Sequence, residues 1–347
     1  MALPTTPKQC DIKIKSLKEK NSISAKNKLV EEGYGLVGNH SAVKICLWTK
    51  HALRGDRGCW KEKFYGISSV GCCQMTPSLF HCENKCLHCW RNLDYTSNQK
   101  INDADNPEKI LDRIVEARKK LLMGFKGRKG INLKKFGEAL EPTLYTMSLS
   151  GEPTLYPRLG EMFKEIRKRG AVSFLVTNGL NPQVIAGFKN DELPTQITVS
   201  TNAPNKKLFD SWHRSTKKDA WKEFNETLKV IKNLKGKVRR VIRLTLVKEG
   251  VEGEFNDMTN MSDENVEEYC DLIRKAEPDF IHVKGFKSVG SARARMGYDS
   301  QPWFKEVKNY AEKIRDKLDG YGIAGEDERS CVVMLAREGC ELKIEKV

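Results

Sequence analysis

The sequence predicts an α/β protein folded as an open, partial barrel of six strand–helix units. Between Val70 and about Leu318, short segments rich in β-branched and aromatic residues alternate with longer segments whose apolar residues recur at helical spacing. This alternation predicts βα units around a parallel sheet, and six units are too few to close an eight-stranded barrel. We therefore expect the ligand site at the carboxyl ends of the strands, where the connecting loops converge.

The elements are predicted in order along the chain. Residues 1–40 are polar, rich in lysine and without clear periodicity, so we expect a loosely structured arm. Strands are predicted within 70–82 and at 143–149, 171–177, 195–201, 238–247, 279–286 and 331–336. Helices are predicted from Pro107, over 155–169, and along three apolar faces made by Trp221, Phe224, Leu228 and Ile231, by Val266, Tyr269 and Ile273, and by Trp303, Val307, Tyr310 and Ile314.

Composition and charge indicate an anionic partner. With 61 Lys+Arg against 46 Asp+Glu, the 347-residue chain has a formal net charge of +15, which favours nucleic acid over a membrane surface. No segment approaches the ~18 apolar residues of a membrane-spanning helix, and no apolar core follows the N-terminal lysines as in a signal peptide. We expect a cytoplasmic protein whose 11 cysteines are reduced, so that metal binding is favoured over disulfides.

Three cysteines lie close together in the segment FHCENKCLHCW, where Cys82, Cys86 and Cys89 are spaced C-x3-C-x2-C. A structural zinc site would need a fourth ligand, and no second pair of Cys or His follows. A [4Fe-4S] cluster needs only three cysteines if its fourth iron stays open to another ligand. The spacing therefore favours an iron–sulfur cluster over a zinc site or a surface cysteine cluster.

Polar motifs follow successive predicted strands. They are SGEPTLYP with Glu152, TNG with Thr177 and Asn178, and STN with Ser200 and Asn202. Each motif alone is an ordinary turn. Because the carboxyl ends of parallel strands meet at one edge, the three together predict a single polar cup beside the cysteine loop.

These features resemble the radical S-adenosylmethionine (SAM) superfamily, over roughly residues 70 to 340. The resemblance implies a partial (β/α)6 TIM-like barrel of radical SAM type, with SAM chelated to the open iron. It implies that Glu152 and the neighbouring backbone hold the SAM amino group, and that Ser200, Asn202, Thr177 and Asn178 hold its carboxylate and ribose. The residue before the last cysteine is His88, where the superfamily usually has Phe or Tyr.

A second cysteine trio lies upstream. Cys46, Cys59 and Cys72 recur at intervals of 13 residues. Adjacent side chains of a strand face opposite ways, so only one of Cys72 and Cys73 can point into the cup, and the regular interval favours Cys72. Three ligands again leave one iron open, which predicts a second cluster that itself binds a ligand. The alternative is a structural cluster or a zinc site that pins an N-terminal extension.

The two trios together resemble the tRNA 4-demethylwyosine synthases of wybutosine biosynthesis. Further matches are CLHCWRN, SLSGEPTLYP, LTLVK, HVKGF, SARAR and SCVVMLAR, with departures at Ser215 and Ser291. The resemblance implies two [4Fe-4S] clusters, SAM, an external electron donor of flavodoxin or ferredoxin type, and two substrates. These are pyruvate and a 1-methylguanosine next to the anticodon of phenylalanine tRNA, whose condensation closes a third ring.

Three basic residues receive roles in this interpretation. Lys61 lies two residues after Cys59, and a lysine crowded by cations can form a Schiff base with a ketone such as pyruvate. Arg293 and Arg295 follow the sixth strand at the rim of the cup and are expected to contact tRNA phosphates. The basic segment 125–135 is a weaker candidate, because loops from helix to strand lie on the face opposite the cup.

We expect two parts: an arm and extension over 1–69 that contributes second-cluster ligands, and the barrel with its C-terminal strand and tail over 70–347. The chain is expected to be monomeric. The remaining cysteines are expected to be buried apolar fillers: Cys10, Cys73, Cys270, Cys331 and Cys340. Two alternatives stay open, namely another radical SAM enzyme with one or two clusters, and a non-catalytic RNA-binding protein stabilised by zinc.

Overall fold

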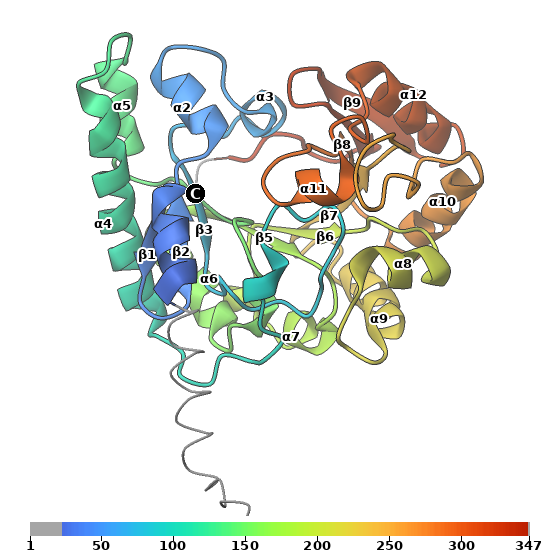
Figure 1. The fold of residues 1–347 in the computed structure, drawn as a ribbon, viewed down its shortest axis with the longest axis horizontal. Helices are drawn as coiled ribbons and strands as arrows, with labels where there is room; N and C mark the ends of the chain where they lie inside the picture. The colour runs from blue at the N-terminus through green and yellow to red at the C-terminus, as the bar shows by residue number, and fades with distance from the viewer. Residues whose placement is uncertain (1–22, 346–347) are drawn as a thin grey trace, which may run out of the picture.

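The computed structural model describes residues 23–345, which form one ten-stranded sheet flanked by helices (Figure 1). Its six central strands pair in parallel and in chain order. They are β3 (Cys72–Thr76), β4 (Leu144–Met147), β5 (Val172–Thr177), β6 (Gln196–Ser200), β7 (Arg239–Leu246) and β8 (Phe280–Gly285). The predicted partial barrel of six βα units is confirmed.

Five amphipathic helices surround the sheet (Figure 1). They are α4 (Pro107–Lys126), α6 (Leu159–Lys168), α9 (Ala220–Asn233), α10 (Glu264–Ala276) and α12 (Phe304–Arg315). Pro107 occupies the first turn of α4 behind the Asn106 cap, where a missing N–H costs nothing. One prediction is wrong, because Trp303 caps α12 and is 57% exposed instead of belonging to its buried face.

Within the described residues, the N-terminal segment is more ordered than predicted. A helix over 23–31 leads into a hairpin of β1 (Tyr34–Val37) and β2 (Ser41–Lys44), and β2 pairs antiparallel with β3. The expectation of a loose arm is therefore wrong for 23–37, where strands of four residues are too short to show periodicity. The part of that prediction covering residues 1–22, including Cys10, lies outside the described residues.

Two short helices follow, α2 (Leu47–Leu53) and α3 (Trp60–Tyr65), and they reach the opposite edge of the sheet. That edge is β9 (Tyr321–Asp327), which pairs with β10 (Val332–Arg337). Both guanidinium NH groups of Arg57 donate to Asp327 at 2.8 Å. Gly325 leaves room for the Phe64 ring, which a Cβ there would meet at 2.6 Å. The extension thus bridges the two edges that six βα units leave apart.

Several further elements escaped prediction because each has eight residues or fewer, about two helical turns at most. They are α5 (Leu133–Ala139), α7 (Pro182–Ala186), α8 (Lys206–His213), α11 (Ala292–Met296), and the 3-10 helices η1 (Leu93–Tyr95), η2 (Pro153–Leu155) and η3 (Asn190–Glu192). In Figure 1, α11 lies in front of the strands, and α8 lies to their right, between α10 and α9. These short elements shape the loops around the cup.

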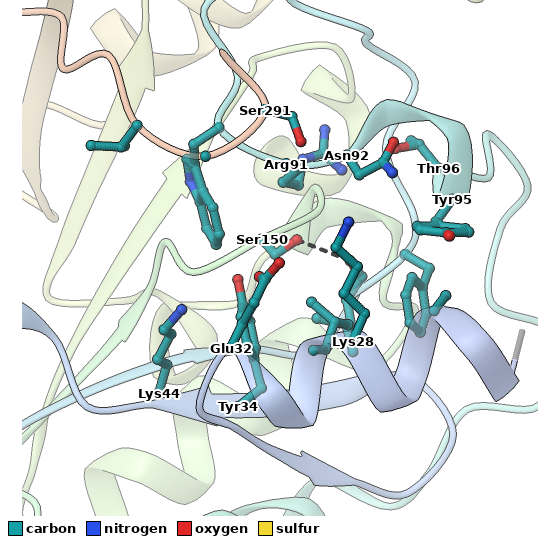
Figure 2. A pocket seen from close by; sticks show the side chains of 17 residues that line it. Lys28, Glu32, Tyr34, Lys44, Arg91, Asn92, Tyr95, Thr96, Ser150 and Ser291 are labelled. Carbon is teal, nitrogen blue, oxygen red and sulfur yellow. Dashed lines mark hydrogen bonds between the residues drawn. The ribbon is translucent and has the colours of Figure 1, made fainter. Parts of the chain in front are cut away.

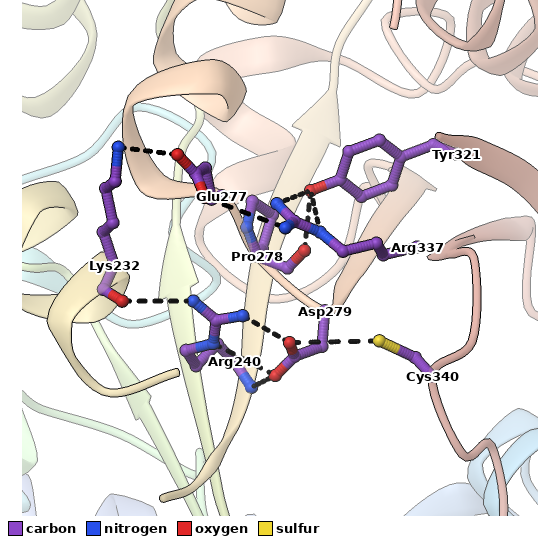
Figure 3. Close-up of polar contacts among 8 residues, drawn as sticks. All are labelled: Lys232, Arg240, Glu277, Pro278, Asp279, Tyr321, Arg337 and Cys340. Atoms are coloured by element: carbon purple, nitrogen blue, oxygen red, sulfur yellow. Dashed lines mark hydrogen bonds and ion pairs between the residues drawn. The ribbon is translucent and has the colours of Figure 1, made fainter. Parts of the chain in front are cut away.

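An ion-pair network closes the amino-terminal end of the sheet beside β7 and β8 (Figure 3). The fully buried guanidinium of Arg240 donates to both carboxylate oxygens of Asp279, at 2.5 and 3.2 Å. The Tyr321 hydroxyl donates to the Pro278 carbonyl at 2.6 Å. A buried guanidinium is tolerated only when it is paired in this way.

The sheet packs on two apolar layers. The larger lies between the strands and the outer helices, and it contains Cys73, Cys270 and Cys331. The smaller fills the barrel interior near the strand starts, around Phe64, Tyr65 and Phe174. Cys340 is half-buried at its margin, so the expectation of buried fillers holds for three of the four described cysteines. In residues 23–345, no helix is long and apolar enough to cross a membrane.

Candidate active site

Backbone hydrogen bonds fix the cysteine loop after β3. Lys85 N–H donates to the His213 carbonyl at 2.9 Å, and Leu87 N–H donates to the Trp212 carbonyl at 3.0 Å, so the loop is attached to the end of α8. Cys82 N–H donates to the Ser97 carbonyl at 2.8 Å. The loop is thus held from both sides, which curls it as three converging thiols require.

Cys82, Cys86 and Cys89 lie near enough to one another for their charges to interact. Burial raises the pKa of Cys86, and the charges of Cys89 and Cys82 raise it further. Arg91 Nε donates to Cys89 Sγ at 3.1 Å. If the three thiolates held an iron–sulfur cluster, their negative charge would balance the Arg91 guanidinium. Arg91 is therefore suited to lie beside such a cluster. Sequence reasoning missed Arg91, although its position two residues after Cys89 was a usable signal.

Glu152 is a buried hub of the polar cup. One carboxylate oxygen accepts from the Thr154 and Thr177 hydroxyls, both at 2.7 Å, and the other accepts from Asn178 N–H at 2.7 Å. Burial and the nearby Glu83 carboxylate raise the pKa of Glu152 to about 7. Its side chain therefore positions the loops after β4 and β5, and the backbone beside it is what faces the cup.

Asn178 connects this hub to the cysteine loop. Its amide Nδ2 donates to Glu83 at 3.2 Å and lies 3.9 Å from Cys82 Sγ. Gly151, just before Glu152, has φ +73° and comes so close to the Ser78 carbonyl that a Cβ would overlap it. Only glycine fits at this position, which brings the SGE backbone directly against the cysteine loop.

Ser200 is the last residue of β6 and Asn202 lies in the loop that follows, on the far side of the cup. The Ser200 hydroxyl accepts from Arg243 at 2.7 Å. Trp212 Nε1 donates to His88 Nδ1 at 2.7 Å, so neutral His88 carries its proton on Nε2, 3.3 Å from the Asn202 amide. The structure places Asn202 Nδ2 against that proton. Exchanging the amide nitrogen and oxygen lets the oxygen accept the proton and puts the NH2 where the buried Oδ1, which has no partner among the described residues, now lies.

The second trio lines a cavity of about 350 Å³ inside the barrel. Cys46 and Cys59 stand at the starts of α2 and α3, and Cys72 is the first residue of β3. Cys73, its neighbour, points into the outer core. The cavity runs from this trio toward Trp90, which directly follows Cys89. It therefore joins the surroundings of the two trios.

Lys61 lies in this cavity. Its Nζ donates to Cys72 Sγ at 3.3 Å and to Thr146 Oγ1 at 3.2 Å. Burial lowers the pKa of Lys61, but the charges of Cys72, Cys59 and Cys46 outweigh it, so the pKa is raised overall. The expected lowering by crowded cations is therefore wrong for Lys61 while the three sulfurs are free, because cysteines are its nearest charged neighbours.

The cavity wall carries cations without a carboxylate. Besides Lys61, Arg243 and Lys284 line it, and its lining among the described residues includes no Asp or Glu. Burial lowers the pKa of Arg243 to about 10, and burial with the Arg243 charge lowers the pKa of Lys284 to about 8. Arg243 Nε is buried and has no hydrogen-bond partner among the described residues. Buried cations need a counter-ion, so the wall fits an anionic ligand.

A single metal ion does not fit either trio. Over residues 23–345, no three His, Cys, Asp or Glu side chains gather closely enough to hold one ion. A [4Fe-4S] cube spreads its cysteine ligands further apart than one zinc ion does.

Arg293 and Arg295, both expected at the rim of the cup, have different surroundings. Arg293 is exposed on α11. Arg295 Nε donates to the Leu87 carbonyl at 3.0 Å, and another of its guanidinium nitrogens donates to the Cys89 carbonyl. Arg295 therefore fastens the cysteine loop to α11. The basic segment 125–135 packs against the extension, where Asn132 N–H donates to the Leu53 carbonyl at 2.8 Å.

Comparisons with known proteins agree with this geometry. A family model described as the radical SAM superfamily matches residues 77–262, and one described as wyosine base formation matches residues 275–337. The S-adenosyl-L-methionine-dependent tRNA 4-demethylwyosine synthase of Pyrococcus abyssi is 39% identical over 310 residues, which cover 89% of this chain and 87% of that protein. The protein of that name from Oryza sativa is 35% identical over 312 residues, 45% of its length.

Two solved structures are similar over nearly the whole chain. One, of TYW1 with a lysine–pyruvate adduct bound, has a TM-score of 0.78 and 31% identity, covering 92% of this chain and 97% of that one. The crystal structure of archaeal TYW1 has a TM-score of 0.71 and 29% identity, covering 92% and 99%.

Proposed function

Because this chain belongs to the tRNA 4-demethylwyosine synthase family of radical SAM enzymes, we propose that it acts on phenylalanine tRNA. Its substrates are a 1-methylguanosine next to the anticodon and pyruvate, two of whose carbons complete the tricyclic base. The observation that carries the proposal is the barrel cavity, which holds one cysteine trio, three cations and no described carboxylate.

Two [4Fe-4S] clusters belong to this proposal. Cys82, Cys86 and Cys89 hold one, to which SAM binds, and Cys46, Cys59 and Cys72 hold the other. The chemistry that these groups supply when bound is one-electron cleavage of SAM and removal of hydrogen from an unreactive carbon.

The chain's own residues orient SAM. Glu152 acts through the loops it fixes, since its four hydrogen bonds engage both carboxylate oxygens. Thr177 and Asn178 are held by that hub, so the Asn178 amide is presented beside Cys82. Ser200 and Asn202 offer a hydroxyl and an amide NH2 across the cup. Arg243, whose guanidinium bonds Ser200, adds a positive charge suited to the SAM carboxylate.

Lys61 is the residue that captures pyruvate. After the ammonium of Lys61 gives a proton to the ketone oxygen, its nitrogen attacks the ketone carbon, and loss of water leaves a protonated Schiff base. Lys284 lines the same wall and offers an ammonium for the pyruvate carboxylate. A keto acid in this position would satisfy cations that otherwise lack a counter-ion. The lysine–pyruvate adduct described for a similar TYW1 structure supports this role.

The test uses anaerobically reconstituted protein, a chemical reductant in place of the external flavodoxin- or ferredoxin-type donor, SAM, labelled pyruvate and 1-methylguanosine-containing tRNA. We expect label in a tricyclic nucleoside, detected by mass spectrometry, only when all components are present. SAM cleavage without labelled RNA would indicate another radical SAM enzyme, and zinc without iron would indicate the RNA-binding alternative.

A separate measurement addresses Lys61. Borohydride should trap labelled pyruvate on the wild-type protein, and Lys61→Arg should abolish trapping because a guanidinium does not form the imine. Trapping that persists in Lys61→Arg would assign the adduct to another lysine, of which Lys284 is the first candidate, with Lys284→Arg as the matched variant.

A further inference from the structure

A second cavity, of about 610 Å³, lies outside the barrel interior and has no role in the function proposed above (Figure 2). Its floor is the helix over 23–31 with the hairpin that follows, and its roof is the segment after Cys89 with the loop between β8 and α11. In Figure 2, Lys28 and Glu32 rise from the helix toward Arg91 and Asn92 on the opposite wall. The cavity thus opens beside the cysteine loop.

Three aromatic side chains line the cavity. Phe80, Trp90 and Tyr95 line the cavity, and all three are half-buried, so their rings remain partly accessible. Trp90 stacks on buried Tyr34 with ring centroids 6.1 Å apart and planes 22° apart, which fixes its orientation. Aromatic faces of this kind bind nucleobases by stacking, largely independent of base identity.

Cationic side chains lie among these rings. Lys28, Lys44 and Arg91 line the cavity against one carboxylate, Glu32. Among the described residues, neither Lys28 nor Lys44 forms an ion pair. The Lys44 ammonium lies 4.4 Å from the Tyr34 ring centroid. Because Arg91 is already bonded to Cys89, two cations, Lys28 and Lys44, remain against one anion, Glu32. This balance favours a ligand that carries negative charge in addition to a flat, stacking group.

The two cavities share one side chain. Trp90 lines both the outer cavity and the barrel cavity, and Arg91, which lines the outer cavity, bonds Cys89. A ligand in the outer cavity would therefore be separated by one side chain from the chamber in which a base would react. In a single strand, consecutive nucleotides are joined by one phosphate. Two cavities separated by one side chain could therefore hold two neighbouring nucleotides, one in each cavity.

We propose that the outer cavity binds the nucleotide next to the modified guanosine, with its base stacked on the Tyr95 ring and its phosphate near Lys28. This inference rests on the proposed function. SAM also carries an adenine, but its sulfonium is cationic and it has no phosphate. The cationic side chains of the cavity therefore disfavour SAM as its ligand. Holding the neighbouring nucleotide would keep the target base unstacked and directed into the barrel.

The test uses anticodon stem-loop RNA with 2-aminopurine on either the 5′ or the 3′ side of 1-methylguanosine, added to reconstituted protein. One of the two probes should lose fluorescence on binding, because it stacks on the Tyr95 ring. Tyr95→Ala should restore that fluorescence and weaken binding at least about fivefold. Tyr95→Phe, which keeps the ring, should behave like wild type.

Salt dependence tests the phosphate contact. Lys28→Ala should reduce the slope of log affinity against log salt by about one. Lys305→Ala, which removes the same charge from an exposed site on α12, should leave it unchanged. Equal effects of the two variants, or unquenched probes on RNA that is still modified, would overturn the cavity assignment alone. Recovery of fluorescence on adding SAM would assign the cavity to SAM, and RNA that neither binds nor is modified would overturn the proposed function as well.

Discussion

His213 shows how one buried side chain makes the cup sensitive to acid. It is buried at the end of α8, its ring lies 4.2 Å from that of Phe209, and its carbonyl accepts Lys85 N–H from the cysteine loop. Burial lowers the pKa of His213 to about 4. The neutral ring is therefore part of the folded structure around the first cysteine trio.

The sign of the pH effect follows from this shift. The folded-state pKa lies below the unfolded value of about 6.5, so the stabilisation is complete above pH 6.5 and is lost as pH falls toward 4. On lowering the pH from 7 to 5, the protonation of this residue should lower the free energy of unfolding by about 2 kcal/mol. His213→Phe keeps an aromatic ring and should lower the pH dependence by that amount in urea unfolding under matched anaerobic conditions. An unchanged pH dependence would contradict it.

Single residues of the site could be predicted where their spacing along the sequence was regular. The interval of 13 and the alternation along a strand were enough to favour Cys72 over Cys73, which the structure separates into the cavity and the outer core. Arg243 and Lys284 were missed, because a basic residue in a strand is usually a solvated one. Their inward-facing positions on buried central strands, which parallel sheets normally fill with apolar residues, were the available signal.

Short elements decide how the cysteine loop is held. The chain between Cys82 and Cys89 has no regular structure of its own, so its shape comes from the end of α8 on one side and from α11 on the other. Both helices have eight residues or fewer and could not be recognised from periodicity. The long helices and central strands were predictable because they span several periods, whereas these contacts exist only after the barrel forms.

Arg295 on α11 gives this argument a test. Its guanidinium spans two carbonyls, of Leu87 and Cys89, which a glutamine cannot do. Arg295→Gln should release iron from the reconstituted protein several-fold faster under an iron chelator, followed by absorbance. The control is Arg293→Gln on the same helix. It should release iron at the wild-type rate because Arg293 is exposed. Equal rates of iron release in the two variants would contradict the role of Arg295 in holding the cysteine loop. The tRNA contact predicted from the sequence would then be its remaining role.

At the scale of the whole molecule, the extension and the barrel act as one chamber. Arg57 pairs with Asp327, and the Tyr65 hydroxyl lies 2.5 Å from His282 Nε2 on β8, so the segment carrying Cys46 and Cys59 is fixed against the far edge of the sheet. The second trio therefore stands at the start of the strands and the first beyond their ends. This separation predicts that the two proposed clusters assemble independently.

Two single substitutions distinguish the trios. Cys46 caps α2 by accepting Thr49 N–H at 3.3 Å, and serine is a good cap, so Cys46→Ser should preserve the helix while weakening the cluster. Iron should fall from about eight to about four per chain, with SAM still cleaved to 5′-deoxyadenosine but pyruvate no longer incorporated. Cys86→Ser should also halve the iron, yet it should abolish SAM cleavage because it removes a ligand of the SAM-binding cluster. Identical losses in the two variants would mean that the trios serve a single centre, and the division of labour between the two ends of the barrel would then be wrong.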